Sequence, residues 1–521
     1  MTNDQHILWI DDEIELLEPH ILLLEDKGYQ VTRVTNGRDA VERVQTQRFD
    51  LIFLDEQMPG MNGIETLQRI KGLTPELLVV MVTKSEEEHI MDDAIGRQIS
   101  DYLIKPVHPK QVLLTCKRLL ERRRIREETV SRDYLSSFGE ISAAMAQKPT
   151  TSDWIDIYLR LVAADRELAG DEGLRQVLED QIRETNREFG RYVEEHYSDW
   201  VSRISELPGK TRPALSPDVI PKWVAPQIGK GKPVFFFVID CMRLDQWLEM
   251  ERMLYPYFDM EKDYYFSILP TATPYSRNSV FSGLLPSDLA RRYPTWWQSA
   301  EEDEQSRNRH EDLFLGDLLK RRHLTPKFNY EKVIRTHEGR TIAQSILNLA
   351  ENDLTAIVVN FVDNLAHSRS DSAVLKEIAP DERAYRALTG TWFEHSWLFE
   401  TFQSLSRIDC TIIITTDHGV IRALHPTKVI GDKETSTSLR YKVGRNLKCD
   451  SRHSLHIREP EEYGLPGRQL NTHYIVAKED YYFVYPTNYN HYVNLYKDSM
   501  QHGGISMEEM ILPVIRLRPN P

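Results

Sequence analysis

The sequence has 521 residues, of which 40% are hydrophobic, and a formal net charge of −15. This length allows two or three domains with buried cores, and the acidic balance argues against a general binder of nucleic acid or other polyanions. The longest apolar run, Val234–Ile239, is too short to cross a bilayer, and the N-terminus lacks the regions of a signal peptide, so we expect a cytoplasmic protein without a membrane span.

Residues 1–120 alternate strand-like runs with amphipathic segments, which predicts a doubly wound parallel sheet of five strands. Helical spacing of apolar residues separates the runs, for example over Glu13–Lys27 and Gly37–Gln45. The expected strands are Ile7–Ile10, Gln30–Val34, Leu51–Leu54, Leu77–Val82 and Asp101–Ile104.

Residues 121–207 are rich in Leu, Arg, Glu and Ala and carry apolar residues at helical spacing. This pattern predicts a helical connector in the form of a small three-helix bundle. Residues 208–232 then concentrate proline and glycine, which predicts a linker.

A second α/β domain is predicted for residues 233–521. Near-continuous apolar runs are typical of strands that are buried on both faces. The expected strands are Val234–Ile239, Tyr264–Leu269, Thr355–Val362, Thr411–Thr415 and Met510–Ile515. The polar segments Tyr293–Thr336 and Thr427–Thr472 lie between the site motifs, and we expect them to form loops or a cap over a pocket.

Acidic residues follow two predicted strands of the first domain, Asp11 and Asp12 after the first strand and Asp55 after the third. Ligands of open α/β sheets bind at this carboxyl edge. Clustered carboxylates suit Mg²⁺, which keeps several waters and joins phosphate oxygens. One carboxylate can then attack a phosphoryl group.

Two more residues at this edge fit a phosphoryl site. Thr83 ends the fourth strand, where its hydroxyl can reach a phosphoryl oxygen. Lys105 ends the fifth strand and is followed by Pro106, and such a pair suggests a constrained peptide, including the cis form, that aims the ammonium at the phosphate.

The first domain resembles the receiver domains of response regulators along its whole length. The motifs that carry the resemblance are Ile10-Asp11-Asp12-Glu13, Asp55–Gly63, Val82-Thr83-Lys84 and Lys105-Pro106. The resemblance implies that a sensor histidine kinase phosphorylates Asp55 and that Asp11 and Asp12 hold Mg²⁺. It makes Thr83 the switch hydroxyl, Tyr102 the switch aromatic residue and Lys105 the phosphate-sensing cation.

Acidic and imidazole side chains also follow the strands of the second domain. Asp240 ends Val234–Ile239, Asp417-His418 follow Thr411–Thr415, and His502 precedes the last strand. Asp363 ends Thr355–Val362, and His367 comes four residues later, so a helical turn would place both on one face. A mixed Asp/His set suits zinc, and two zinc ions a few ångströms apart would clamp the attacking and leaving oxygens of phosphoryl transfer.

The nucleophile of such a site should be a hydroxyl beside the metal ligands. The turn Leu269–Pro274 contains Thr271 and Thr273, and zinc would activate either hydroxyl by lowering its pKa. Both threonines are therefore candidates.

The second domain resembles the alkaline phosphatase superfamily, and within it the PglZ domain, from about Lys232 to the C-terminus. The nucleophile of that superfamily precedes a glycine at a spacing that Thr273 and Gly283 match, which favours Thr273 over Thr271. Arg277 stands where the related sulfatases carry an arginine. The resemblance implies two zinc sites, the first made by Asp240, Thr273, Asp417 and His418 and the second by Asp363, His367 and His502.

The whole chain resembles PorX-type response regulators, which join these parts and act in type IX secretion. The resemblance implies a two-zinc phosphatase or phosphodiesterase, with a phosphoester or a cyclic or linear oligonucleotide as ligand. Our mechanistic hypothesis is that phosphorylation of Asp55 controls this activity, after which the helical connector changes its packing or pairs with a second subunit in a phosphorylation-dependent homodimer. The alternative is a non-catalytic effector that binds a sigma factor or a component of the secretion machinery. Direct binding to duplex DNA is not expected, because the sequence has no helix-turn-helix with a basic recognition helix.

Overall fold

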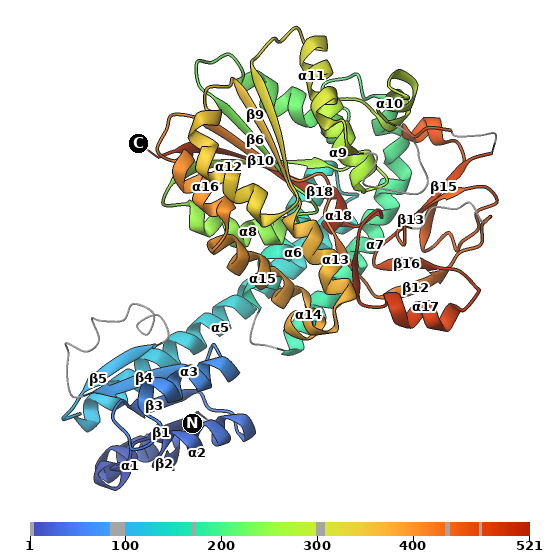
Figure 1. Ribbon diagram of the computed structural model, residues 1–521. Helices are drawn as coiled ribbons and strands as arrows, with labels where there is room; N and C mark the ends of the chain where they lie inside the picture. The colour runs from blue at the N-terminus through green and yellow to red at the C-terminus, as the bar shows by residue number, and fades with distance from the viewer. Residues whose placement is uncertain are drawn as a thin grey trace. The chain divides into compact units, whose positions relative to one another are not determined.

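The computed structural model describes residues 5–83, 99–168, 172–297, 308–432, 438–467 and 471–520 (Figure 1). The chain divides into two compact units, Met1–Ser136 and Ser137–Pro521. Helix α5 (Pro109–Ala146) begins in the first unit and ends in the second. None of the helices in these ranges combines the length and apolarity that a bilayer crossing requires.

In the first unit, five described strands form a parallel sheet in the order β2-β1-β3-β4-β5, as predicted. Ile7 and Trp9 belong to one buried cluster and Leu8 and Ile10 to another, so both faces of β1 are covered. The elements of the sheet and its helices are β1 (His6–Ile10), η1 (Ile14–Leu17), α1 (Glu18–Asp26), β2 (Gln30–Val34), α2 (Gly37–Thr46), β3 (Leu51–Asp55), α3 (Gly63–Leu73), β4 (Leu78–Thr83) and β5 (Asp101–Ile104).

One element of this unit differs from its prediction. The single helix expected over Glu13–Lys27 is a 3-10 turn, η1, followed by α1. Pro19 lies in the first turn of α1, where its missing N–H is harmless, whereas the same proline in the interior of one long helix would break it.

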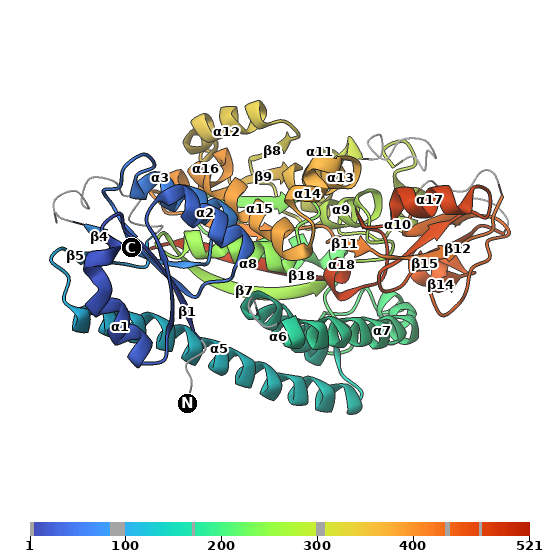
Figure 2. The same ribbon diagram turned by 90° about the horizontal axis from the view of Figure 1, so that it is seen from below.

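The helical character predicted for the connector is confirmed by α6 (Thr151–Glu167) and α7 (Glu172–Ser202), which lie side by side (Figure 2). Thr150 and Asp153 form a capping box that starts α6. Aromatic side chains of α7 reach the sheet of the same unit, since the Phe189 and Trp200 rings lie 6.2 and 5.6 Å from Phe266. The two helices therefore pack as part of the second unit.

The segment 208–232, predicted as a linker, is packed rather than free-standing. Leu215, Val219 and Ile220 are fully buried, and Leu215 bridges to Phe266. Arg212 is buried in an ion pair with Asp218. Short turns η3 (Ser216–Asp218), η4 (Ile220–Val224) and η5 (Ala225–Gln227) run through the segment. A proline lies in the first turn of each of these short helices, and the apolar residues of the segment pack into the core.

The main sheet of the second unit has six strands within the described ranges, in the order β7-β18-β10-β6-β9-β8. The strands from β10 to β8 are parallel, and β18 is antiparallel to both β10 and β7. Their bounds are β6 (Val234–Ile239), β7 (Phe258–Phe266), β8 (Phe328–Val333), β9 (Leu354–Val359), β10 (Thr411–Thr415) and β18 (Ile511–Pro519).

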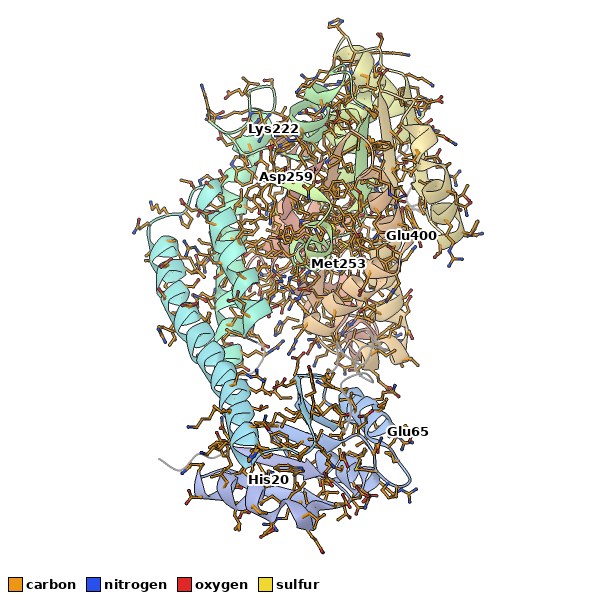
Figure 3. All side chains as sticks on the ribbon, turned by 90° about the vertical axis from the view of Figure 1, so that its left-hand side faces the viewer. His20, Glu65, Lys222, Met253, Asp259 and Glu400 are labelled. Atoms are coloured by element: carbon orange, nitrogen blue, oxygen red, sulfur yellow. The ribbon has the colours of Figure 1, made fainter. Side chains whose placement is uncertain are left out.

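Helices cover both faces of this sheet (Figure 1). Phe235 and Phe237 pack under the helices of one face, and the ring of Phe236 meets Phe281 of α9 on the other. Met253 of α8 packs against the first of these cores (Figure 3). The helices of the unit are α8 (Leu244–Leu254), α9 (Thr273–Ser282), α10 (Pro286–Arg292), α11 (Glu311–Arg321), α12 (Thr336–Leu349), α13 (Phe361–Asp371), α14 (Ala373–Ile378), α15 (Glu382–Glu394) and α16 (Trp397–Leu405).

Three strands of this unit differ in extent from their predictions. Strand β9 ends at Val359, so the prediction that Asp363 ends it was wrong; the residue lies in the first turn of α13. The partners of Val359 in the neighbouring strands, Ile239 and Val333, also end their strands, and the chain leaves the sheet at Asn360. Strands β7 and β18 are longer than expected because each pairs with the other along its whole length.

The two polar inserts were expected as loops or a cap, and the described parts of both contain regular structure. The first contributes α11 and the edge strand β8, whose half-exposed side chains explain its polar sequence. The second contributes strands of small sheets. The remaining elements are β11 (Ile421–Ala423), β12 (His425–Lys428), β13 (Tyr441–Gly444), β14 (Ser454–Ile457), η7 (Pro460–Tyr463), β15 (His473–Ala477), β16 (Tyr481–Val484), α17 (Tyr489–Tyr496), β17 (Ser499–Gln501) and α18 (Met507–Met510).

Candidate functional sites

The first unit gathers three carboxylates at the carboxyl edge of its sheet. Asp11 and Asp12 follow β1, and Asp55 is the last residue of β3. One oxygen from each lies within 4.8 Å of the others, with Asp11 and Asp55 buried and Asp12 exposed. The Lys105 ammonium lies 3.0 Å from Asp11 Oδ2 and 3.0 Å from Asp55 Oδ2. The strand ends thus bring together the residues predicted to form a phosphoryl site.

The surroundings of Asp55 raise the pKa of its carboxyl group. Burial raises its pKa, the hydrogen bond from Lys105 lowers it, and the negative charge of Asp11 raises it again, with a raised pKa as the result. Thr83 ends β4 and is buried, and Tyr102 of β5 is 46% exposed. The Lys105–Pro106 peptide is cis.

In the second unit, the ends of β6 and β10 bring the residues of the first predicted zinc site together. Asp240, Asp417 and His418 are fully buried, and a ligand atom from each lies within 4.8 Å of the others. Thr273 begins α9, and its Oγ1 lies 3.0 Å from His418 Nε2. All four residues of this predicted set therefore meet at one place.

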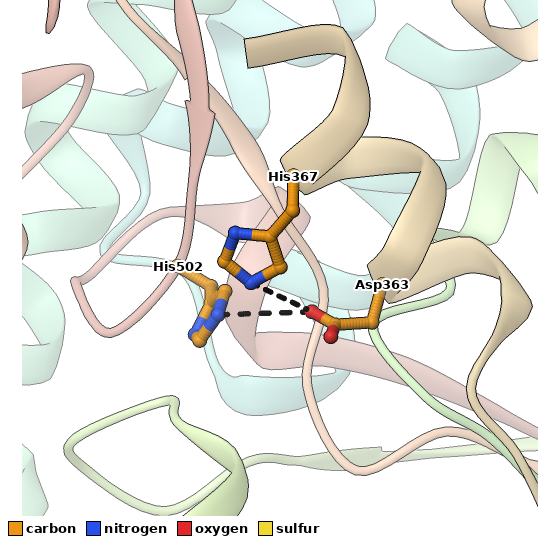
Figure 4. Close-up of side chains that lie close together, drawn as sticks. All are labelled: Asp363, His367 and His502. Carbon is orange, nitrogen blue, oxygen red and sulfur yellow. Dashed lines mark ion pairs between the residues drawn. The ribbon is translucent and has the colours of Figure 1, made fainter. Parts of the chain in front are cut away.

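The residues of the second predicted zinc site meet beside α13 (Figure 4). Asp363 and His367 share one face of the helix, and His367 Nε2 lies 3.4 Å from Asp363 Oδ1. His502, which follows β17, points its Nε2 toward the same oxygen at 3.9 Å. Burial, and then the neighbouring His418, lower the pKa of His502 to about 3, so its imidazole is neutral at ordinary pH.

The two clusters form a single centre, because the rings of His418 and His502 lie 4.3 Å apart and nearly parallel. Burial raises the pKa of Asp240 to about 7; Arg277 opposes this rise, while Asp417 and Asp363 add to it. So much negative charge in a buried centre needs positive charge nearby.

The donor set fits metal ions on two further grounds. Within the described part of the chain, Oδ1 of Asp240 and Nδ1 of His502 are buried without a hydrogen-bond partner. Buried polar atoms are seldom left unpaired unless another group completes them. Neutral imidazoles and carboxylates are the ligands that suit zinc in sites with open positions.

Arg277 lies on α9 with its guanidinium buried in this centre. Its Nε donates to Asp417 Oδ2 at 3.0 Å, its Nη2 pairs with Asp240, and its Nη1 lies 3.7 Å from Glu311 Oε1. It contacts two predicted metal ligands directly, which places it where it would offset their charge.

The two threonine candidates have different surroundings. Thr271 is fully buried; its hydroxyl donates to Gly504 O at 2.8 Å and accepts from Gly503 N–H at 3.1 Å. Thr273 presents its hydroxyl to His418 instead. Thr271 thus ties its turn to the strand end that carries His502, while Thr273 faces the cluster.

Sequence reasoning missed several polar residues at this centre. Asn360 donates from Nδ2 to Asp240 Oδ2 at 3.0 Å, and its position directly after an apolar strand could have drawn attention to it. Glu311 pairs with Lys332 at 3.2 Å behind Arg277. Glu311 and Lys332 both lie in the first polar insert. No local pattern marks Glu311 there, because its partner Arg277 comes from a helix distant in the sequence.

Three family models match successive parts of the chain. A model of the BREX system PglZ alkaline phosphatase-like domain matches residues 219–517. A model of the response regulator receiver domain matches residues 7–117. A model of the PorX response regulator linker domain matches residues 124–201.

Similarity to curated proteins is partial. The transcriptional regulatory protein ZraR of Klebsiella oxytoca is 33% identical over 149 residues, which are 28% of this chain and 34% of that protein. The alginate biosynthesis transcriptional regulatory protein AlgB of Pseudomonas syringae pv. tomato is 36% identical over 123 residues, 24% of this chain and 28% of that protein. The chain therefore spans only about a third of the length of these relatives. Among solved structures, the chemotaxis protein CheY4 of Vibrio cholerae is 30% identical, with 22% of this chain and 98% of that chain covered and a TM-score of 0.21.

Proposed function

Because the chain belongs to the family with a PglZ alkaline phosphatase-like domain, joined to the receiver and linker of PorX-type response regulators, we propose that it is a phosphorylation-controlled phosphoesterase. The input is transfer of a phosphoryl group from a sensor histidine kinase to Asp55, with Mg²⁺ held by Asp11, Asp12 and Asp55. The output is hydrolysis of a phosphate ester at the centre of the second unit, and this hydrolysis regulates type IX secretion.

The observation that carries this proposal is the position of Thr273. Its hydroxyl lies 3.0 Å from His418 Nε2, and the ring of His418 lies 4.3 Å from that of His502 in the second ligand cluster. A hydroxyl that contacts one ligand set, beside which a second set lies, has the surroundings of an activated nucleophile. The hydroxyl of Thr271 instead forms hydrogen bonds with two backbone groups that follow β17, those of Gly503 and Gly504.

Two zinc ions, one held by Asp240, Thr273, Asp417 and His418 and the other by Asp363, His367 and His502, would lower the pKa of the Thr273 hydroxyl and offset charge on the phosphoryl oxygens. Thr273 Oγ1 forms a bond to phosphorus as the bond from phosphorus to the leaving oxygen breaks, and the hydroxyl proton passes by way of water to that oxygen, which leaves as the alcohol. A second water then attacks phosphorus, the bond to Thr273 Oγ1 breaks and the hydroxyl is restored. A phosphodiester substrate then releases a phosphate monoester, and a monoester substrate releases inorganic phosphate. Arg277 stabilises the buried carboxylates throughout this sequence.

We propose phosphodiesters, including cyclic or linear oligonucleotides, as the substrate class, with phosphate monoesters as the alternative. The test is hydrolysis of bis(4-nitrophenyl) phosphate by the full chain with zinc and after chelation, beside the variants Thr273→Ala and Thr271→Ala. We expect zinc-dependent turnover that Thr273→Ala abolishes. Metal binding without turnover of a diester or a monoester would instead favour an effector that binds a sigma factor or a secretion component.

A further inference from the structure

Helix α7 of the connector places the buried side-chain amide of Asn186 against the short helix α18. Asn186 is 4% exposed. Its Nδ2 donates to both oxygens of Glu508, at 3.2 and 3.0 Å, and its Oδ1 accepts the Met507 N–H at 2.8 Å. These contacts use both ends of the amide and fix the short helix α18 from one side.

Helix α18 in turn connects the two loops that carry imidazole ligands. The backbone carbonyl of Glu509 accepts the N–H of Gly419, the residue after His418, at 3.1 Å. Its side-chain Oε1 accepts the N–H of Gly504, two residues after His502, at 2.8 Å. The Glu509 carboxylate is fully buried and held by the Arg440 guanidinium. A displacement of α18 would therefore move the neighbours of His418 and His502 together.

A second contact from α7 reaches the turn that carries the nucleophile. Tyr197 is fully buried, and its hydroxyl oxygen accepts the Leu269 N–H at 2.8 Å. Tyr197 and Asn186 lie about three helical turns apart, so they share one face of α7. One helix, α7, thus contacts both the turn before Thr273 and the helix α18.

We propose that Asn186 is a positioning residue, and that α7 sets the geometry of the catalytic centre through Asn186 and Tyr197. The proposal rests on the proposed function and names the way in which that site is regulated. A change in the packing of the connector reaches the metal ligands through these two contacts. A misplacement of about 1 Å in a catalytic site lowers the rate by about a hundredfold, so a small movement of α7 is sufficient.

The test uses the full chain and exchanges the members of the Asn186–Glu508 pair. Asn186→Asp keeps an acceptor for the Met507 N–H, but it removes the Nδ2 donor to Glu508 and places a second carboxyl group against it. The double variant Asn186→Asp with Glu508→Gln restores an amide–carboxylate pair with its roles reversed. We expect kcat for bis(4-nitrophenyl) phosphate to fall by about tenfold or more in Asn186→Asp, with KM little changed, and to return to within about threefold in the double variant.

A spectroscopic reading separates positioning from general stability. With cobalt in place of zinc, the visible absorption of the metal reports the geometry of its ligands, and we expect it to change in Asn186→Asp and to recover in the double variant. Arg187→Ala is the matched control, because Arg187 is the exposed neighbour of Asn186 on the same helix. It should keep the wild-type kcat and spectrum.

The outcomes are distinct. A normal kcat and cobalt spectrum in Asn186→Asp, with only a lower melting temperature, would reduce Asn186 to a packing role and overturn the proposal. A loss that the double variant does not repair would overturn it as well. If Asn186→Asp does not fold, Tyr197→Phe, which removes only the acceptor of the Leu269 N–H, must lower kcat or the proposal fails. If the wild type binds metal but hydrolyses nothing, the proposed function fails, while the cobalt spectra still decide the positioning role.

Discussion

At the scale of single residues, identical side chains have different roles because their hydrogen bonds differ. Thr271 and Thr273 are two positions apart in one turn, but the hydroxyl of Thr271 is consumed by Gly503 and Gly504, whereas that of Thr273 faces His418. A hydroxyl that already donates and accepts within the backbone is poorly placed to attack a substrate. The surroundings, rather than the residue type, support Thr273 as the nucleophile.

This difference predicts that substitutions at the two threonines affect different properties of the protein. Thr271→Val should lower the free energy of unfolding by about 1–3 kcal/mol, because it leaves the buried Gly503 N–H and the Gly504 carbonyl without a partner. Thr273→Ser should retain both the fold and measurable turnover, since it keeps the hydroxyl. Urea unfolding and the diesterase assay on both variants check this, and a Thr271→Val protein as stable as the wild type would contradict it.

Glu508 is a second residue whose surroundings predict a measurable effect. Burial, followed by the negative charge of Glu382, raises its pKa to about 7 from an ordinary value of 4.5, although Arg243 and Asn186 oppose the rise. The folded protein therefore binds this proton more tightly than the unfolded chain does. The resulting contribution to stability is complete below about pH 4.5 and is lost as the pH rises through about 7.

Because this contribution to stability is lost as the pH rises, Glu508→Gln should remove the pH dependence that Glu508 causes. A pKa difference of this size corresponds to about 3 kcal/mol, so between pH 5 and pH 8 the wild type should lose up to this much unfolding free energy relative to the variant. Urea denaturation at the two pH values measures the difference. The same pH dependence in Glu508→Gln and wild type would show that another group is responsible.

At the scale of elements, the site is assembled where strands end and helices begin. Asp240 and Asp417 follow β6 and β10, and Asp363 and Thr273 lie in the first turns of α13 and α9. Parallel strands bring these ends to one edge, and the short helix α18 closes the centre from behind. The close approach of Gly419 to α18 is part of this closure.

Gly419 offers a test of that closure. A Cβ at this position would lie 1.9 Å from the carbonyl oxygen of Glu508, so Gly419→Ala must displace α18 or the loop that carries His418. We expect a loss of about 1–3 kcal/mol in stability and a weaker affinity for zinc. Calorimetry and zinc titration measure both. Gly467→Ala is the control, because a Cβ there meets nothing within 4 Å, and equal effects of the two substitutions would exclude the contact as the cause.

At the scale of the whole molecule, the chain combines a receiver, a helical linker and a PglZ domain. The helix α5 belongs to both compact units, and α6 and α7 pack within the second. The helices α6 and α7 are therefore structural parts of the unit that holds the candidate catalytic centre.

The whole-molecule prediction concerns Asp55. Beryllofluoride with Mg²⁺, a mimic of the phosphoryl group, should shift the protein toward a dimer and change the turnover of the diester. Asp55→Asn should respond in neither property, because it lacks the carboxylate that binds the mimic. Analytical ultracentrifugation and the hydrolysis assay provide the readings. A wild-type protein unchanged by the mimic in both would show that the receiver does not control the second unit in this way.

The sequence alone determined the fold class and nearly all of the candidate site residues. Buried strands need apolar side chains at successive positions, and the polar residues that follow them, such as Asp55, Asp240 and Asp417, stand out by local contrast. The tertiary structure decided what depends on contacts between distant segments. It placed Asp363 on a helix, made an edge strand of part of a polar insert, and showed which threonine contacts His418. It also revealed Asn186, whose partner Glu508 lies 322 positions away, so no local pattern records the hydrogen bonds that join them.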